Sequence, residues 1–256
     1  MSIYIIVWFL ISAFLLGFWV WSGYMSYKQK KAWRFFADKK KMRYHSAAFF
    51  QSPTISGVVD EYSVSVFPGE HEAADTRFSR NLTAIEVNLH SKLPTRAAIG
   101  SGGMVNVIDA LGLMQEFKPP VKGWDDSYII RCEYLGIAQN YLNDDRLNIL
   151  INLMRLEKAW VIVLFNGSEG LLRLDTPRPI DTPKEMDVLV KQMITVAKAL
   201  ELNKGEERDL LREESLSAKT SKVLDIDDDL LDDHLGIELE EDDVELPASK
   251  DKKSKK

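Results

Sequence analysis

The stretch Ile3–Gly23, which reads IYIIVWFLISAFLLGFWVWSG, decides the architecture of this chain. It carries no charged side chain. A helix of about 20 apolar residues crosses a hydrocarbon core of about 30 Å, and it satisfies its own backbone polar groups there. Trp8, Trp19, Trp21, Tyr24 and Tyr27 lie toward its ends, where amphipathic rings favour the membrane interface. The sequence therefore predicts a transmembrane anchor over residues 1–27.

The flanks of the apolar run argue for an uncleaved anchor with a defined orientation. A cleaved signal peptide would have a basic start, a shorter apolar run and a small-residue cleavage site, and this sequence has none of the three. Eight Lys and Arg side chains follow the run within residues 28–43, and none precedes it. The positive-inside rule then predicts a single-pass protein of the cell inner membrane, with its C-terminal domain in the cytoplasm.

Charge is segregated along the chain, so the net charge of −6 describes no single surface. Residues 28–43 carry a net +7, residues 44–205 a net −4, residues 206–245 a net −13 and the last eleven residues a net +4. A composition of 45% hydrophobic and 28% charged residues excludes a wholly disordered chain and a polytopic membrane protein. The mildly acidic central part argues against a nucleic-acid partner.

The basic stretch at residues 28–43 has two interpretations that can coexist. In the first, it is a juxtamembrane segment on the lipid bilayer, where each base near an anionic surface contributes about 1 kcal/mol. In the second, it is the first helix of the domain, with Ala32, Trp33, Phe36 and Ala37 facing a core. The predicted membrane-surface residues are Lys28, Lys30, Lys31, Trp33, Arg34, Lys39, Lys40 and Lys41.

Residues 44–204 are predicted to form one α+β domain, a mostly antiparallel sheet packed by two or three helices. Residues 54–67 alternate around Asp60-Glu61 and predict one half-buried strand. Further strands are predicted over residues 82–89, 96–99, 127–134, 160–165 and 171–174. Helices are predicted over residues 105–113, 145–157 and 184–200, the second capped by Asn143 or Asp144.

The chain resembles uncharacterised prokaryotic proteins that have one N-terminal transmembrane helix and a cytosolic α+β domain. The residues that carry the resemblance are Trp33–Ala37 with Tyr44, Ile55-Ser-Gly57, the strand within Gly123–Tyr134, the Leu-rich helix and Val196-Ala197 in the closing helix. The resemblance implies that fold and topology. It implies no activity, cofactor or partner.

Two short segments contain residue types that are found in phosphate-binding or metal-binding sites. Gly100–Gly103 lies between a strand and a helix, as phosphate-binding glycines do, but the third small residue of the dinucleotide fingerprint is replaced by Val105. Adjacent ligands at Glu70, His71 and Glu72 do not converge on one ion without a special loop. The sequence therefore predicts no cofactor and no metal.

Two further features have both a chemical and a structural interpretation. Cys132 could act as a nucleophile with a histidine base, but it follows the apolar face of a predicted strand, where free cysteine packs as a small hydrophobe. Asp125 and Asp126 precede the same strand, as acid–base carboxylates or as ordinary turn residues. The structural interpretation is preferred for both.

The segment at residues 205–256 is predicted to be a disordered acidic tail with a basic terminus. Apolar side chains interrupt its carboxylates, a pattern that folds on a partner with a basic surface. The predicted partner-binding residues are Ile226, Leu230, Leu231, Leu235 and Ile237. A solvating spacer and a contact with the chain's own basic stretch remain open alternatives.

These features favour a single-pass, membrane-anchored adaptor or scaffold that recruits partner proteins at the cytoplasmic membrane face. Enzymatic activity is left open, with the balance against it. One alternative is a membrane-tethered enzyme or small-ligand sensor with a site around Gly100–Gly103 and Asp125–Asp126. Another is an assembly subunit of a larger membrane complex.

Overall fold

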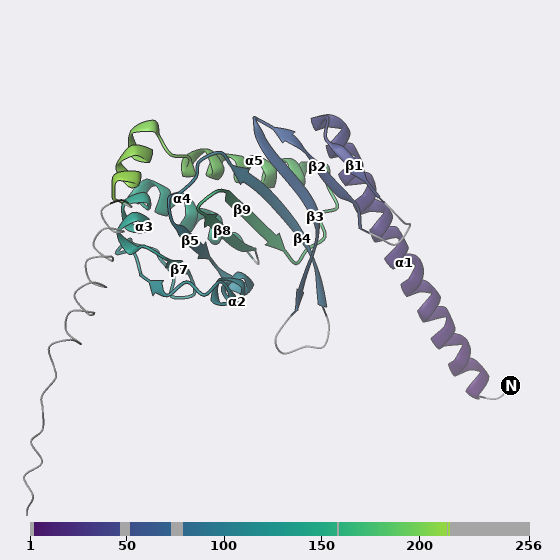
Figure 1. The fold of residues 1–256 in the computed structure, drawn as a ribbon. Coiled ribbons are helices and arrows are strands. Elements are labelled where there is room, and N and C mark those ends of the chain that lie inside the picture. The colour runs from purple at the N-terminus through teal and green to yellow at the C-terminus, as the bar shows by residue number, and fades with distance from the viewer. Residues whose placement is uncertain (1–2, 47–51, 73–78, 158, 214, 216–256) are drawn as a thin grey trace, which may run out of the picture. The chain divides into compact units, whose positions relative to one another are not determined.

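The structure is a computed structural model that describes residues 3–46, 52–72, 79–157, 159–213 and 215 (Figure 1). The helices are α1 (Ile3–Lys40), α2 (Val105–Ala110), α3 (Leu135–Tyr141), α4 (Asp144–Met154) and α5 (Pro183–Leu200), with a 3-10 turn η1 (Gly102–Met104). The strands are β1 (Arg43–His45), β2 (Thr54–Val59), β3 (Tyr62–Glu72), β4 (Ser79–Leu89), β5 (Arg96–Gly100), β6 (Gln115–Glu116), β7 (Ile129–Cys132), β8 (Trp160–Asn166) and β9 (Gly170–Thr176).

The strands form one sheet in the order β1-β2-β3-β4-β9-β8-β5-β7-β6. Every neighbouring pair is antiparallel. An N-terminal apolar helix followed by an antiparallel sheet with helices confirms the predicted α+β class.

Residues 54–67, predicted to form one strand, are two strands of a hairpin, so this prediction is wrong. Asp60 and Glu61 have φ values of +49° and +75°, and Val59 pairs with Tyr62 across them. Positive φ at both central residues is the geometry of the two-residue turn that follows the twist of a hairpin. The polar pair that interrupts the alternation is therefore the turn itself.

The two faces of the sheet are covered differently. The large core lies between one face and the helices α1, α3, α4 and α5. A smaller cluster on the other side joins η1 and α2 to β5 and β8, through Met104, Ile108, Ala98 and Ile162. The sheet thus has a helix layer over one face and a short helical cap over part of the other.

Helices α4 and α5 are close to their predicted positions, and each begins with a side-chain cap, which the sequence predicted for α4 alone. The Asn143 side chain accepts a 3.0 Å hydrogen bond from the Arg146 amide, and the Thr182 side chain accepts one from the Glu185 amide. Each cap satisfies an amide that has no partner inside its helix. The buried residues of α5 are Met186, Val190, Met193, Ile194, Val196, Ala197 and Leu200.

The folded part of the chain continues beyond residue 204, where the sequence placed the start of the tail. Residues 204–213 are helical and Leu210 is buried. Glu206 pairs with Arg146, and Glu213 accepts a 2.7 Å hydrogen bond from the Asn140 side chain. These contacts join the segment to α3 and α4.

Candidate functional site

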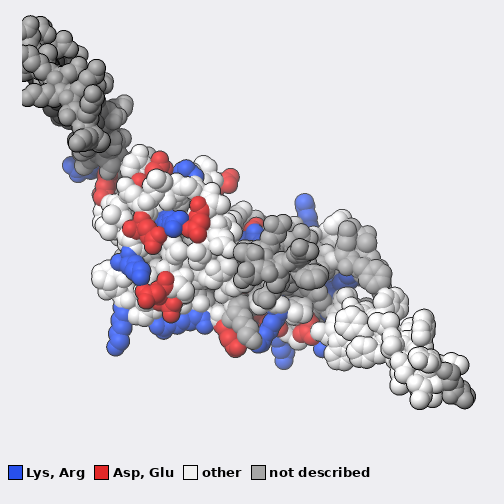
Figure 2. Space-filling model, turned by 90° about the horizontal axis from the view of Figure 1, so that it is seen from below, with Lys and Arg blue, Asp and Glu red and all other residues white. Residues whose placement is uncertain are grey.

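The C-terminal half of α1 belongs to the domain, while its N-terminal half does not. Ala32, Trp33, Phe36 and Ala37 are buried in the large core. The first half is long and apolar enough to cross a membrane, and none of its apolar window is buried. In Figure 2 that half shows no Lys, Arg, Asp or Glu, whereas blue and red side chains are distributed over the domain. One continuous helix therefore joins the apolar segment to the core.

Ion pairs reinforce the packing of α1 against α5 and the loop before it. The Nζ atom of Lys28 lies 3.2 Å from a carboxylate oxygen of Asp181. The Nζ atoms of Lys39 and Lys40 lie 3.5 and 3.4 Å from the carboxylate oxygens of Asp187. Desolvation raises the pKa of Asp187, but the hydrogen bond from Lys191 and the charges of Lys40 and Lys39 outweigh it, so this pKa lies below its ordinary value. The Asp187 carboxylate therefore stays ionised and offsets the lysines around it.

The structure separates the residues that the sequence grouped at the membrane surface. Trp33 does not lie at the membrane surface, because its side chain has no exposed surface and its Nε1 donates a 2.9 Å hydrogen bond to the Ile180 carbonyl. It faces the domain core with Ala32, Phe36 and Ala37, as the second interpretation of the basic stretch predicts. Lys28, Lys39 and Lys40 are engaged with carboxylates of the domain. Lys31, Arg34 and Lys41 are exposed, and Lys30 is half-buried.

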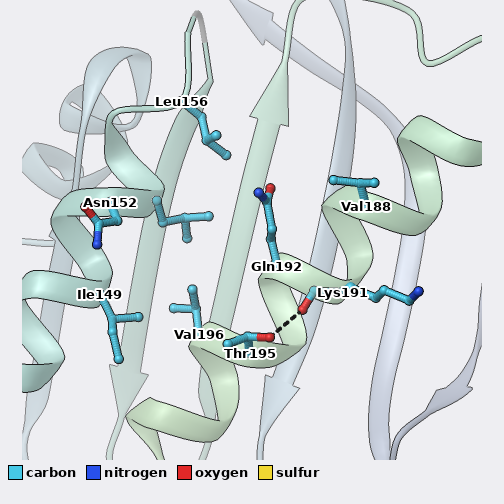
Figure 3. Close-up of a pocket in the computed structure, with 9 residues that line it drawn as sticks. Ile149, Asn152, Leu156, Val188, Lys191, Gln192, Thr195 and Val196 are labelled. Atoms are coloured by element: carbon cyan, nitrogen blue, oxygen red, sulfur yellow. Dashed lines mark hydrogen bonds between the residues drawn. The ribbon is translucent and has the colours of Figure 1, made fainter.

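A groove of about 450 Å³ lies between α4 and α5, on the side of these helices away from the sheet core (Figure 3). Its apolar side chains come from both helices, and its polar groups come mainly from α5. The lining residues are Ile149, Asn152, Leu153, Leu156, Val188, Lys191, Gln192, Thr195 and Val196.

The chemistry of the groove suits apolar binding better than catalysis. The Thr195 hydroxyl donates a 2.9 Å hydrogen bond to the Lys191 carbonyl of its own helix, as Figure 3 shows. The remaining polar side chains of the lining are two amides and the Lys191 ammonium. Apolar clefts of about 300–1,000 Å³ with a few polar groups are typical ligand sites. The groove can therefore hold an apolar ligand or the apolar side of a peptide.

Sequence reasoning did not find this groove, although one signal of it is visible in the sequence. Val188 lies off the buried stripe of α5 and is 54% exposed. Ile149 lies off the buried face of α4 in the same way. The spacing shows only that each helix has an additional apolar residue. It does not show that the two residues face one another across a gap.

The glycines at residues 100–103 serve packing. Gly102 has a φ of +60°, and a Cβ at Gly102 or Gly103 would collide with the Trp160 ring. A Cβ at Gly100 would lie 2.7 Å from Ile108 Cδ1. The absence of side chains thus lets the η1 turn lie against the Trp160 ring on β8.

Asp125 and Asp126 behave as turn and surface residues. Asp125 accepts hydrogen bonds from the Ser127 amide at 2.9 Å and the Ser127 hydroxyl at 2.7 Å. These bonds lower the pKa of Asp125. Asp126 is exposed and pairs with Lys118 at 2.7 Å. The two carboxylates are therefore engaged in local contacts of the loop before β7.

Cys132 is fully buried in the core on β7, and burial raises the pKa of its thiol. Burial restricts access to the thiol and disfavours its thiolate form, and both effects oppose nucleophilic chemistry. No group of three or more His, Cys, Asp and Glu side chains is placed to hold a metal within the described part of the chain. The side chains of Glu70, His71 and Glu72 lie outside that part.

The buried thiol gives a direct prediction for chemical labelling. Iodoacetamide should modify Cys132 in the native protein about 100-fold more slowly, or slower still, than in concentrated urea, because reaction requires opening of the core. The measurement is the labelling rate by intact mass in both conditions. Similar rates in the two conditions would show that β7 is open to solvent.

The predicted partner-binding residues Ile226, Leu230, Leu231, Leu235 and Ile237 lie outside the residues that the structure describes. Their role therefore stays a prediction from the sequence. The described chain reaches Ser215, and the residues beyond it contain the whole of the acidic, apolar segment.

Comparison with known proteins identifies no family. No family model matches the chain, and no curated protein matches it significantly. Among solved structures, the chain is similar to the crystal structure of the mycobacterial trehalose monomycolate transport factor A, TtfA. The two are 11% identical, the match covers 72% of this chain and 94% of that chain, and the TM-score is 0.39. A likeness at this level carries no argument about activity.

Proposed function

We propose that the chain is a single-pass, membrane-anchored adaptor or scaffold that holds an α+β domain at the cytoplasmic face of the cell inner membrane. The observation that carries the proposal is the continuity of α1, which runs from an apolar segment long enough to span a bilayer into the domain core without a break. A domain joined to its anchor by a helix keeps a constrained height and orientation above the lipid. Such a constraint suits a protein that presents a surface to partners.

The orientation rests on the distribution of charge. Bases follow the apolar half of α1 and none precedes it, which favours a cytoplasmic domain. The lipid bilayer is then the first partner of the chain. A protein with a basic surface is the second, recruited by the acidic segment that contains Ile226, Leu230, Leu231, Leu235 and Ile237.

Affinity capture from gently solubilised membranes tests the recruiting role. The full chain is compared with a version that ends at Ser215, since residues 204–213 pack on the domain and an earlier end point would disturb the fold. A stoichiometric partner that is held by the full chain and lost from the truncated one is expected. A partner set unchanged by truncation would contradict tail-dependent recruitment.

A matched pair of tail variants separates apolar contacts from charge. The first variant carries Leu230→Asp, Leu231→Asp and Leu235→Asp. The control carries Thr220→Asp, Ser221→Asp and Ser249→Asp, which adds the same charge without removing apolar side chains. Loss of the partner from the first variant alone is the expected result, because the apolar side chains supply the buried contact area. Equal loss from both would mean that added charge is the cause.

A membrane-tethered sensor of a small apolar ligand is the second candidate function, and the α4/α5 groove favours it. Binding of an apolar ligand there should be blocked by Val188→Trp, which fills the groove from an exposed position. The control is Val58→Trp, at a residue that is 65% exposed on β2. Ligand binding retained by both variants would contradict binding in the α4/α5 groove.

A further inference from the structure

One face of α1 just beyond the apolar half combines aromatic rings with unpaired positive charge. Tyr24, Tyr27, Lys31 and Arg34 follow one another at intervals of three, four and three residues, which places them on one side of a helix. We call these four residues the outer stripe. Tyr24 is 57% and Tyr27 is 59% exposed, and Lys31 and Arg34 are also exposed.

The opposite side of the same helix is occupied by the domain. There Trp33 and Phe36 are buried and Lys40 pairs with Asp187. Lys28 and Lys39 lie on the flank between this side and the outer stripe, and they pair with Asp181 and Asp187. Lys31 and Arg34 form no salt bridge among the described residues. The domain thus neutralises part of the basic stretch and leaves the charge of the outer stripe available.

Helix geometry determines which of the exposed bases can reach a bilayer. With a rise of about 1.5 Å per residue, the Cα atom of Lys31 lies about 12 Å beyond Gly23 and that of Arg34 about 16 Å beyond it. Side chains of a helix tilt toward its N-terminus, so both cations extend back toward the lipid. Lys41 lies about 27 Å beyond Gly23, outside a headgroup layer of about 5–7 Å and a Debye length of about 8 Å.

We propose that the outer stripe binds the headgroups of anionic phospholipids, with Lys31 and Arg34 on the phosphates and Tyr24 and Tyr27 in the interfacial layer. Lys39, Lys40 and Lys41 make no such contact. The proposal rests on the proposed membrane anchor and refines the predicted membrane surface. Tyrosine favours the interface, and lysine or arginine near an anionic leaflet is attracted to it.

The observations favour lipid over a second copy of the helix. The stripe continues directly from the apolar half of α1, so its surroundings are set by the bilayer that this half would cross. Lys31 and Arg34 would oppose their like-charged counterparts if two stripes met, which is unfavourable. Anionic headgroups neutralise the same charges without that repulsion.

The test is native mass spectrometry of the full chain in detergent, titrated with phosphatidylglycerol or with phosphatidylcholine of the same acyl chains. The wild-type chain should bind phosphatidylglycerol more tightly. Lys31→Gln with Arg34→Gln should reduce this preference by up to about 30-fold, since each base contributes about 1 kcal/mol near the surface and about 1.4 kcal/mol is a factor of ten.

The matched control is Lys41→Gln with Arg43→Gln. It also removes two exposed positive charges, at residues that form no salt bridge within the described structure. This control should retain the wild-type preference, and equal effects of the two variants would overturn the proposal. The same spectra report the oligomeric mass. A wild-type dimer that the outer-stripe variant dissociates would assign the stripe to a second copy instead.

Alkaline carbonate extraction of membranes separates this proposal from the proposed anchor. Wild type and both variants should resist extraction, because the apolar half of α1 is unchanged. A wild-type chain released by carbonate would overturn the anchor and this proposal with it. A resistant wild-type chain with equal affinity for the two lipids would overturn the outer stripe alone.

Discussion

Trp33→Ala is expected to destabilise the folded domain by about 3–5 kcal/mol, the range typical of large aromatic residues replaced by alanine in packed cores. The indole has no exposed surface, and its Nε1 donates a 2.9 Å hydrogen bond to the Ile180 carbonyl. Removing it leaves a cavity and a buried carbonyl without its donor. The same substitution loosens α1 from the loop that leads into α5.

The labelling rate of Cys132 measures this loss in the full chain. When modification proceeds through opening of the core, a loss of about 3–5 kcal/mol raises the rate by about 100-fold to more than 1,000-fold. Phe35→Ala is the control, because Phe35 is a neighbouring aromatic residue that is 61% exposed. Its effect should stay within about 0.5 kcal/mol. Comparable rates for the two variants would contradict the burial of Trp33.

Arg146→Ala is expected to cost about 3–5 kcal/mol, the loss typical when one partner of a buried ion pair is removed. The Arg146 side chain is 5% exposed, and its guanidinium makes two 2.8 Å hydrogen bonds to the Glu206 carboxylate. It also donates to the carbonyls of Tyr141, Ala199 and Glu201. Without it, the end of α5 and the 204–213 helix lose their shared attachment to α4.

Hydrogen exchange at residues 204–213, together with Cys132 labelling, checks this prediction. Exchange in that helix should accelerate in Arg146→Ala and stay unchanged in Arg155→Ala. Arg155 is exposed, and within the described residues its side chain donates a single long hydrogen bond, 3.4 Å from Nη2 to the Gly123 carbonyl. Protection of residues 204–213 that survives Arg146→Ala would contradict the prediction and show that buried Leu210 and the Asn140–Glu213 hydrogen bond are enough to hold the helix.

The stability that the Arg146–Glu206 ion pair contributes should depend on pH in a defined direction. The hydrogen bond from Arg146 lowers the pKa of Glu206 below its ordinary value of 4.5, against desolvation, which raises it. A carboxyl whose pKa is lower in the folded state stabilises that state above the unfolded pKa, and this contribution is lost as the pH falls through the folded value. The stability difference between wild type and Arg146→Ala should therefore decrease below about pH 4.5.

The local regularity of α4, α5, β8 and β9 was visible in the sequence because each element has its own period and its own boundary residues. Asn143 and Thr182 cap the two helices as such residues do in isolation. The sequence did not predict the hairpin turn at Asp60-Glu61, because neither residue is a glycine or an asparagine, the residues that usually mark positive φ in such a turn. The short helix α3 begins without a side-chain cap, so no boundary signal preceded it.

Of the surfaces on α1, the sequence predicts the apolar one but not the exposed basic one. The apolar half of α1 follows from composition alone, since the bilayer imposes a length and a polarity that a run of residues either meets or does not meet. The identity of the bases left free on α1 does not follow from composition. Lys28 pairs with the carboxylate of Asp181, which is 153 residues away in the sequence. Lys39 and Lys40 pair with Asp187 on α5.

The sequence by itself thus determined the apolar span, the α+β class and the concentration of acid toward the C-terminus, because these depend on runs and periods of neighbouring residues. Only the tertiary structure decided between the core and the membrane surface for Trp33, and it alone shows that Lys31 and Arg34 stay exposed and that a groove lies between α4 and α5. Each of these depends on which side chains meet across the fold. Contacts between residues that are far apart in the sequence produce no periodic pattern, so the sequence does not predict them.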